Sequence, residues 1–145
     1  MFISVISPIY NSSKFLELFI KKVIENIRDI TLNYEIILID DFSSDNSWQK
    51  LKKIKKKYKY LKIKQNKKNI GQHPSIREGL KIAEGDLIFI LDCDLQDDPK
   101  NFKIFFNSYN KKNETLIGLM SKNSYKKGFV SEFFWILLNF FSKYK

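Results

Sequence analysis

The chain has 145 residues, 43% of them hydrophobic and 15% aromatic, and a formal net charge of +10. This composition excludes a disordered chain, which needs low hydrophobicity, and the length suffices for one domain with a hydrophobic core. A single cysteine, Cys93, excludes an internal disulfide framework and fits a reducing compartment. No run approaches the ~20 apolar residues of a membrane span, and residues 1–8 show no features of a signal peptide.

Lysine supplies almost all of the positive charge, because Arg28 and Arg77 are the only arginines. Two interpretations are open. The lysines either form a solvated surface or attract an anionic partner, such as a nucleotide diphosphate or an acidic membrane. No helix-turn-helix, zinc or aromatic-strand signature is present, so a nucleic-acid partner is not expected.

Strand-like and helix-like segments alternate along the chain. Short runs of apolar and β-branched residues predict strands at 2–7 (closed by Pro8), 34–39, 61–63, 87–91 and 115–119. Apolar residues at helical spacing predict helices at 15–27, 48–58, from about 72 to 83, and from Pro99 onward. Ser12 or Ser13 is the expected N-cap of the first helix, and Asp45 or Ser47 that of the second.

This alternation, with strands that are apolar throughout, predicts an α/β fold. We expect one domain built on a mostly parallel sheet, with helices on both faces. In such sheets ligands bind beyond the carboxyl ends of the strands.

Polar residues follow three of the predicted strands. Tyr10 and Asn11 come after the first strand and Asp40-Asp41 after the second. Asp92 and Asp94 come after the fourth. Carboxylates held close together repel one another unless a cation neutralises them, and oxygen ligands suit Mg²⁺ or Mn²⁺ shared with substrate phosphates. The pattern therefore predicts a metal-assisted site for a nucleotide diphosphate, in which the ion stabilises the leaving group.

Each cluster also has a simpler interpretation. Asp40-Asp41 can cap the next helix, and the spacing of Asp92 and Asp94 is common by chance. Cys93 is expected to point into the core, because no nearby His or Lys would activate its thiol. His73 is the only histidine, which argues against a histidine-based site.

In combination the clusters resemble the family 2 glycosyltransferases of the GT-A (Rossmann-like) fold, and especially their polyprenyl-phosphate sugar transferases. Order and spacing agree over roughly the first hundred residues. The matching segments are Val5–Asn11, Glu35–Asp45, Asn69–Gln72, Arg77–Leu80, Ala83–Asp86 and Leu91–Pro99. The Leu-Gln-Asp continuation after Asp94 points to the polyprenyl-phosphate branch.

The resemblance implies a role for each matching residue. Pro8, Tyr10 and Asp40 would line the pocket for the base and ribose, with Asp41 beside them. Asp92 and Asp94 would be catalytic, holding the metal and the diphosphate, with Gln96 as a further metal ligand. The other residues assigned to the nucleotide sugar are Asn11, Gly71, Cys93 and, facing the phosphates, Arg77.

The chain departs from the family pattern after the predicted fifth strand. Where the branch usually has an arginine pair, this chain has Met120–Asn123, and Lys122 offers one charge without the bidentate fork. The chain also stops where many relatives continue. We expect residues 1–126 to form a nucleotide-sugar-binding domain, truncated relative to its relatives. Residues 127–145 are expected to form an amphipathic aromatic helix, packed either on the sheet or on a membrane surface.

These inferences lead to one expected function. The chain is expected to be an inverting, metal-dependent glycosyltransferase that uses a UDP- or GDP-linked sugar, at the cytoplasmic face of a membrane. Its acceptor would be a polyprenyl phosphate or a growing surface glycan. The alternative is a catalytically inactive fragment of such an enzyme that only binds the nucleotide sugar.

Overall fold

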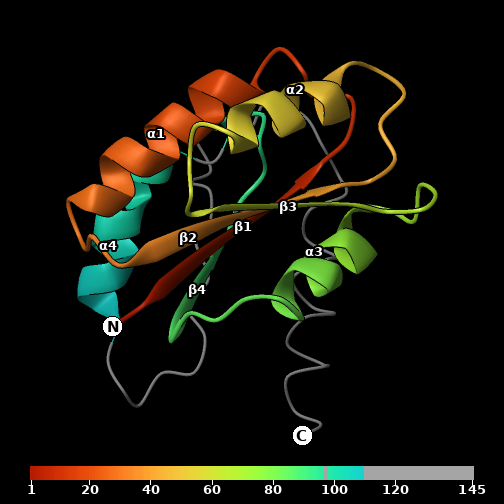
Figure 1. The fold of residues 1–145 in the computed structure, drawn as a ribbon. Helices are drawn as coiled ribbons and strands as arrows, with labels where there is room; N and C mark the ends of the chain where they lie inside the picture. The colour runs from red at the N-terminus through yellow and green to blue at the C-terminus, as the bar shows by residue number, and fades with distance from the viewer. Residues whose placement is uncertain (97, 110–145) are drawn as a thin grey trace, which may run out of the picture. The chain divides into compact units, whose positions relative to one another are not determined.

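A computed structural model describes residues 1–96 and 98–109, in which four parallel strands form one sheet in the order β3-β2-β1-β4 (Figure 1). The strands are β1 (Ile3–Ile9), β2 (Tyr34–Asp40), β3 (Leu61–Gln65) and β4 (Leu87–Ile90). The helices are α1 (Leu16–Arg28), α2 (Ser47–Lys55), α3 (Gln72–Leu80) and α4 (Phe102–Ser108), the last preceded by the 3-10 turn η1 (Pro99–Asn101). The expected α/β class is confirmed.

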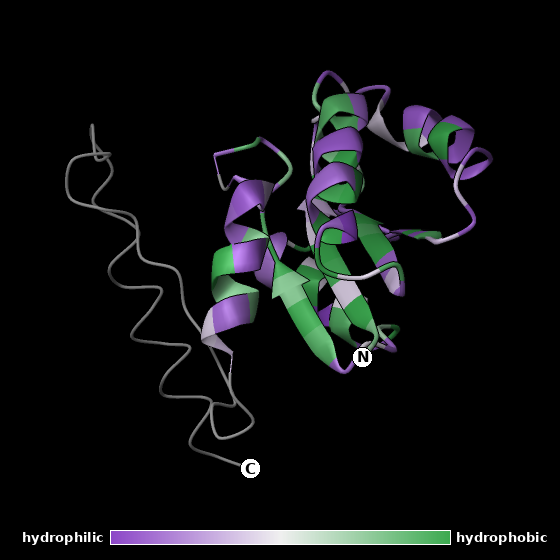
Figure 2. Ribbon diagram, turned by 90° about the vertical axis from the view of Figure 1, so that its left-hand side faces the viewer, coloured by the Kyte–Doolittle hydropathy of each residue, from purple (hydrophilic) through white to green (hydrophobic). Residues whose placement is uncertain are grey.

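The two central strands are buried because helices cover both faces of the sheet. All seven residues of β2 are buried, as its continuous apolar run predicts. Helices α1, α2 and α4 lie on one face, whereas α3 covers the other, where Ile6, Ile37 and Ile39 are fully buried (Figure 1). Figure 2 shows the same division by hydropathy, with largely hydrophobic strands and helices that carry hydrophilic residues on their outer sides.

The sequence predicted that Pro8 ends the first strand, and this prediction is wrong. Successive residues of β1 direct their backbone hydrogen-bonding groups alternately toward β2 and toward β4. The carbonyl of Ile6 accepts a bond from the N–H of Leu91 on the β4 side. Pro8 faces the same side, but β4 ends at Ile90, the partner of Ile6. Because Pro8 lies beyond the paired stretch, its missing N–H removes no ladder bond, and β1 continues to Ile9.

The expected serine cap of α1 is wrong. Phe15 occupies the N-cap position without a side-chain bond, while the hydroxyl of Ser12 donates to the carbonyl of Tyr10. The second helix partly follows expectation, since Asp45 accepts a 2.8 Å bond from the N–H of Ser47 although Asn46 is the N-cap residue.

Several predictions fall outside the described residues. These are the strand at 115–119, the residues at 120–123, the domain boundary at 126 and the C-terminal helix. In the part of the chain that the structure describes, no helix has both the length and the apolar character needed to cross a membrane.

A buried carboxylate joins the sheet to the connection before β4. Glu35, 3% exposed, accepts bonds from the hydroxyl of Ser4 at 2.7 Å and the N–H of Glu84 at 2.8 Å. Its second oxygen lies 2.7 Å from the amino group of Lys62. The chain passes so close here that a Cβ on Gly85 would lie 2.5 Å from the backbone nitrogen of Ser4. Glu35 and Gly85 therefore fix the entry into β4.

We expect Glu35→Gln to lower the free energy of unfolding by ~1–3 kcal/mol at pH 7, the range for a disrupted buried hydrogen-bond partner. Burial works to raise the pKa of Glu35, but bonds from Lys62, Ser4 and Glu84 outweigh it and hold the pKa below 4.5. The stabilisation is thus present above pH ~4.5 and is lost as the pH falls through the folded-state pKa. Denaturant unfolding of both proteins across pH 3–7 measures it.

Glu25→Gln is the control, because Glu25 is an exposed residue that meets only Lys21 at 3.8 Å. A stability difference for Glu35→Gln that is constant with pH would assign the effect to packing rather than charge.

Candidate functional site

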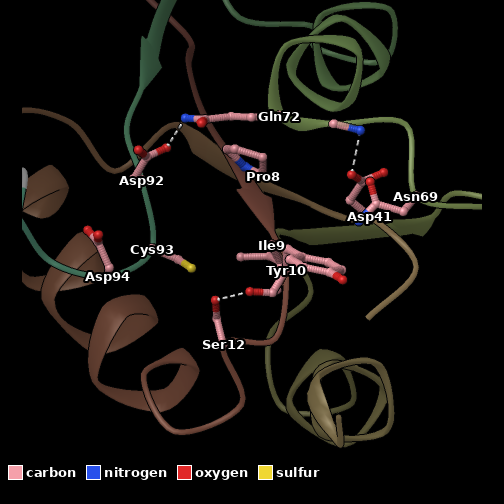
Figure 3. A pocket seen from close by; sticks show the side chains of 11 residues that line it. Pro8, Ile9, Tyr10, Ser12, Asp41, Asn69, Gln72, Asp92, Cys93 and Asp94 are labelled. Carbon is pink, nitrogen blue, oxygen red and sulfur yellow. Dashed lines mark hydrogen bonds between the residues drawn. The ribbon is translucent and has the colours of Figure 1, made fainter. Parts of the chain in front are cut away.

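A pocket of about 360 Å³ opens at the carboxyl edge of the sheet, where β1, β2 and β4 end (Figure 3). Its lining residues are Pro8, Ile9, Tyr10, Ser12, Asp41, Asn69, Gly71, Gln72, Asp92, Cys93 and Asp94. Seven of the eleven residues assigned from the sequence are among them. The other four, Asn11, Asp40, Arg77 and Gln96, do not line it.

Asp41 is the most firmly held carboxylate of the pocket. It is 3% exposed, and its Oδ1 accepts from the side-chain amide of Asn66 at 2.8 Å and the N–H of Ile70 at 2.9 Å. Its Oδ2 accepts from the N–H of Gly71 at 2.7 Å. Burial works to raise the pKa of Asp41, but these hydrogen bonds outweigh it and keep the pKa below its ordinary value. Asp41 is therefore ionised at neutral pH and shapes the loop between β3 and α3.

Gly71 makes this arrangement possible through its backbone conformation. Its φ of 92° is one that residues with a side chain rarely adopt. Its N–H meets Asp41, while its carbonyl accepts from the N–H and the hydroxyl of Ser75. The start of α3 is thereby fixed against the end of β2.

Asp40 is fully buried behind the pocket. Its Oδ2 accepts from the N–H of Ser43 at 3.2 Å and from the side chain of Gln65 at 2.8 Å. Within the described residues its Oδ1 has no hydrogen-bond partner. A buried carboxylate oxygen without a partner is costly, and this one lies behind the residues that line the pocket.

Asn11 supports a neighbouring loop instead of the pocket. Its side-chain oxygen accepts from the N–H groups of Ser44 at 2.9 Å and Asp45 at 3.3 Å. Its own N–H donates to the hydroxyl of Ser43. With φ of 46°, Asn11 adopts the left-handed conformation that asparagine tolerates better than most residues. It ties the end of β1 to the segment before α2.

Asp92 and Asp94 lie on the opposite side of the pocket, directly after β4 (Figure 3). Oδ1 of Asp92 accepts from the side-chain amide of Gln72 at 2.7 Å. Oδ1 of Asp94 accepts from the N–H of Gln96 at 3.0 Å, and Leu95 between them has a φ of 66°. This tight turn leads the chain away from β4 and leaves both carboxylates on the pocket wall.

Cys93 belongs to the hydrophobic core, as expected, although its side chain also reaches the pocket wall. Burial raises the pKa of its thiol, the nearby carboxylates of Asp94 and Asp92 act in the same direction, and a hydrogen bond with Ser12 opposes them. The thiol is therefore protonated at neutral pH and is a poor nucleophile.

The charge of the lining runs against that of the whole chain. Its ionisable acids are Asp41, Asp92 and Asp94, and no lysine or arginine is among the eleven lining residues. Arg77, expected to face phosphates, is exposed on α3 outside this lining. An anion entering the pocket meets carboxylates, which oppose its binding.

The donor set fits a hard divalent cation that shares its coordination with a ligand. Mg²⁺ is commonly held by one or two carboxylates together with substrate phosphates and water, and Asp92 and Asp94 supply two carboxylates. Among residues 1–96 and 98–109, no group of three or more His, Cys, Asp or Glu side chains is placed to hold a metal. The remaining ligands would therefore be phosphate oxygens, water or amide oxygens.

Four lining residues were not predicted from the sequence: Ile9, Ser12, Asn69 and Gln72. Asn69 and Gln72 flank Gly71, which was assigned to the site, so proximity in sequence could have identified them. Ser12 was interpreted as a helix cap. Its N–H donates to the hydroxyl of Ser47 at 2.9 Å, a contact across 35 residues that no local pattern predicts.

About two thirds of the chain is similar to known transferases. An undecaprenyl-phosphate 4-deoxy-4-formamido-L-arabinose transferase of Proteus mirabilis is 37% identical over 105 residues, which cover 68% of this chain and 30% of the relative. A dolichol-phosphate mannosyltransferase of Pyrococcus furiosus is 35% identical over 100 residues, covering 69% and 28%. The chain thus spans about a third of the length of these relatives.

Solved structures confirm the expected GT-A fold. A mannosyltransferase from Pyrobaculum calidifontis, in complex with GDP-Man and Mn²⁺, superposes with a TM-score of 0.57 at 22% identity, covering 63% of this chain and 27% of that one. TarS of S. aureus in complex with UDP-GlcNAc gives 0.52 at 31% identity, covering 65% and 27%. The family model for glycosyl transferase family 2 matches residues 4–141. The chain belongs to glycosyltransferase family 2.

Proposed function

We propose that the pocket binds a nucleotide-diphosphate sugar together with Mg²⁺ or Mn²⁺, and that the protein transfers the sugar with inversion. The observation that carries the proposal is the pair Asp92 and Asp94 on the wall of a pocket whose lining includes no basic residue. Carboxylates repel a dianionic diphosphate, so a cation between them should strengthen its binding. When bound, the divalent ion neutralises the leaving diphosphate.

The two sides of the pocket suggest how the donor lies. The β1 and β2 side offers Pro8 and Tyr10, which suit the base and ribose. Asp40 is a further proposed contact for this part of the donor, although it is buried behind the pocket lining. Asp92 and Asp94, on the β4 side, suit the diphosphate and its cation. Gln96 remains a proposed ligand, and Arg77 a proposed contact for the phosphates. Neither lines the pocket, so both assignments require the loops to move or the ligand to extend beyond the pocket.

The acceptor is proposed to be a polyprenyl phosphate at the cytoplasmic surface of a membrane, as the names of the relatives suggest. In an inverting transfer, an acceptor oxygen attacks the anomeric carbon while the bond to the nucleotide diphosphate breaks. A phosphate oxygen is already ionised at neutral pH, so no protein base is needed to remove a proton. A glycan hydroxyl would need such a base, and the lining residues that could serve are the aspartates.

The metal role predicts how nucleotide binding depends on Mn²⁺. Isothermal titration with UDP, GDP and their sugars should show tighter binding with Mn²⁺ than with EDTA. Asp94→Asn removes a charge at almost constant volume, so it should weaken binding in Mn²⁺ at least ~10-fold, about 1.4 kcal/mol. In EDTA the affinity should not fall, because the substitution removes a charge that repels the diphosphate. Asp29→Asn, an exposed site after α1, is the matched control. Equal affinities with Mn²⁺ and EDTA for every nucleotide would contradict the metal role.

The assignment of Asp40 predicts a loss of binding without a loss of stability. In Asp40→Asn the remaining oxygen can keep the bonds from Ser43 and Gln65, while the open Oδ1 becomes an NH₂ donor. Nucleotide affinity should fall by ~1–3 kcal/mol with little change in Tm. Asp41→Asn, which places a donor among three N–H groups, should melt earlier. An Asp40→Asn protein that melts early but binds nucleotide normally would assign Asp40 to the fold alone.

Transfer itself separates an enzyme from a fragment that only binds. Radiolabelled UDP- and GDP-sugars, with Mn²⁺ and a polyprenyl phosphate, should yield a labelled lipid product that is lost in Asp94→Asn. Product formed only with a glycan acceptor would move the proposal to surface-polysaccharide synthesis. Mn²⁺-dependent binding of donor without any product would favour the inactive form.

A further inference from the structure

Gln72 connects the two sides of the pocket. It is the first residue of α3, and its side-chain Nε2 lies 2.7 Å from Oδ1 of Asp92, across the pocket at the end of β4 (Figure 3). Gln72 and Asp92 are 20 positions apart in sequence. Building on the proposed function, we propose that Gln72 is a positioning residue that sets the orientation of the Asp92 carboxylate toward the divalent cation.

The start of α3 is held firmly enough for Gln72 to do this. Directly before it, the N–H groups of Ile70 and Gly71 donate to the buried carboxylate of Asp41. The carbonyl of Gly71 in turn accepts from the hydroxyl of Ser75 at 2.9 Å. Two hydrogen bonds, joined by the Gly71–Gln72 peptide bond, therefore link Asp41 after β2 to Asp92 after β4.

The chemistry of an amide suits the task. The terminal torsion of an aspartate is broad, so a carboxylate near the solvent samples many orientations unless a neighbour holds one oxygen. A neutral N–H donor holds Oδ1 and preserves the negative charge that a cation requires. A lysine in its place would bring a positive charge and compete with the metal. Hydrogen-bond partners of metal ligands generally contribute 10–100-fold to metal affinity.

The test separates metal affinity from nucleotide affinity in the full chain. Equilibrium dialysis with labelled UDP and GDP gives the Mn²⁺ concentration at which nucleotide binding is half-maximal, and a second series in EDTA gives the metal-free affinity. Gln72→Met keeps the length of the side chain and removes the donor, while Gln72→Ala removes both. Gln49→Ala, at an exposed glutamine of α2, is the matched control.

We expect both Gln72 variants to raise the Mn²⁺ midpoint about tenfold, with the EDTA affinity and the Tm close to those of the wild type. If Gln72→Ala does not fold, Gln72→Met carries the test. An unchanged midpoint, or an equal loss of binding in Mn²⁺ and EDTA, overturns this inference and leaves the proposed function standing. A wild-type chain whose nucleotide binding ignores Mn²⁺ overturns the proposed function and the inference with it.

Discussion

The parallel pairing of β1 with β2 on one side and β4 on the other brings together the strand ends that line the pocket. Ile9 pairs with Asp40, and Ile6 with Ile90, so the polar residues that follow all three strands emerge at one edge. Because side chains alternate along a strand, a register shift of one residue would turn each of these strand ends to the opposite face. The buried apolar residues on both faces oppose such a shift, so the hydrophobic core holds the polar site in place.

Three ways of accommodating a carboxylate occur in the part of the chain that the structure describes. Glu35 is buried against Lys62 and two neutral donors. It pairs with Ser4 at the start of β1, whereas the pocket lies where β1 ends. Asp41 is held by neutral hydrogen-bond donors, whose combined effect keeps its pKa below the ordinary value. Asp92 and Asp94 follow β4, where a side-chain amide donates to Asp92 and a backbone N–H donates to Asp94.

The sequence predicts the strands and helices well because burial on two faces leaves a simple signature. The continuous apolar run of β2 and the helical spacing of α1 are both present in the structure. The site was predicted where strand ends carry acids, as for Asp41, Asp92 and Asp94. Prediction failed where the outcome depends on a partner distant in sequence. Pro8 is tolerated because β4 stops short of it, and Ser12 is engaged by Ser47 instead of capping α1.

The same reasoning explains why the roles of Asn11 and Gln72 could not be read from a motif. Both belong to segments that resemble the family, yet one supports a loop through Ser44 and the other reaches Asp92. A motif records that a residue type matters at a position. Only the three-dimensional contacts tell whether its side chain faces the ligand or holds another residue that does.

The basic character of the chain and the acidic lining of its pocket act over different distances. Between residues 46 and 77 the chain has eleven lysines and no acid, although Lys62 and Lys64 are paired with glutamates. A field of this sign raises the local concentration of anions, but salt screens it beyond a Debye length of ~8–10 Å. Inside the pocket the nearby carboxylates dominate and oppose an anion. In the proposed function, a nucleotide diphosphate attracted from solution is retained when a divalent cation offsets this repulsion.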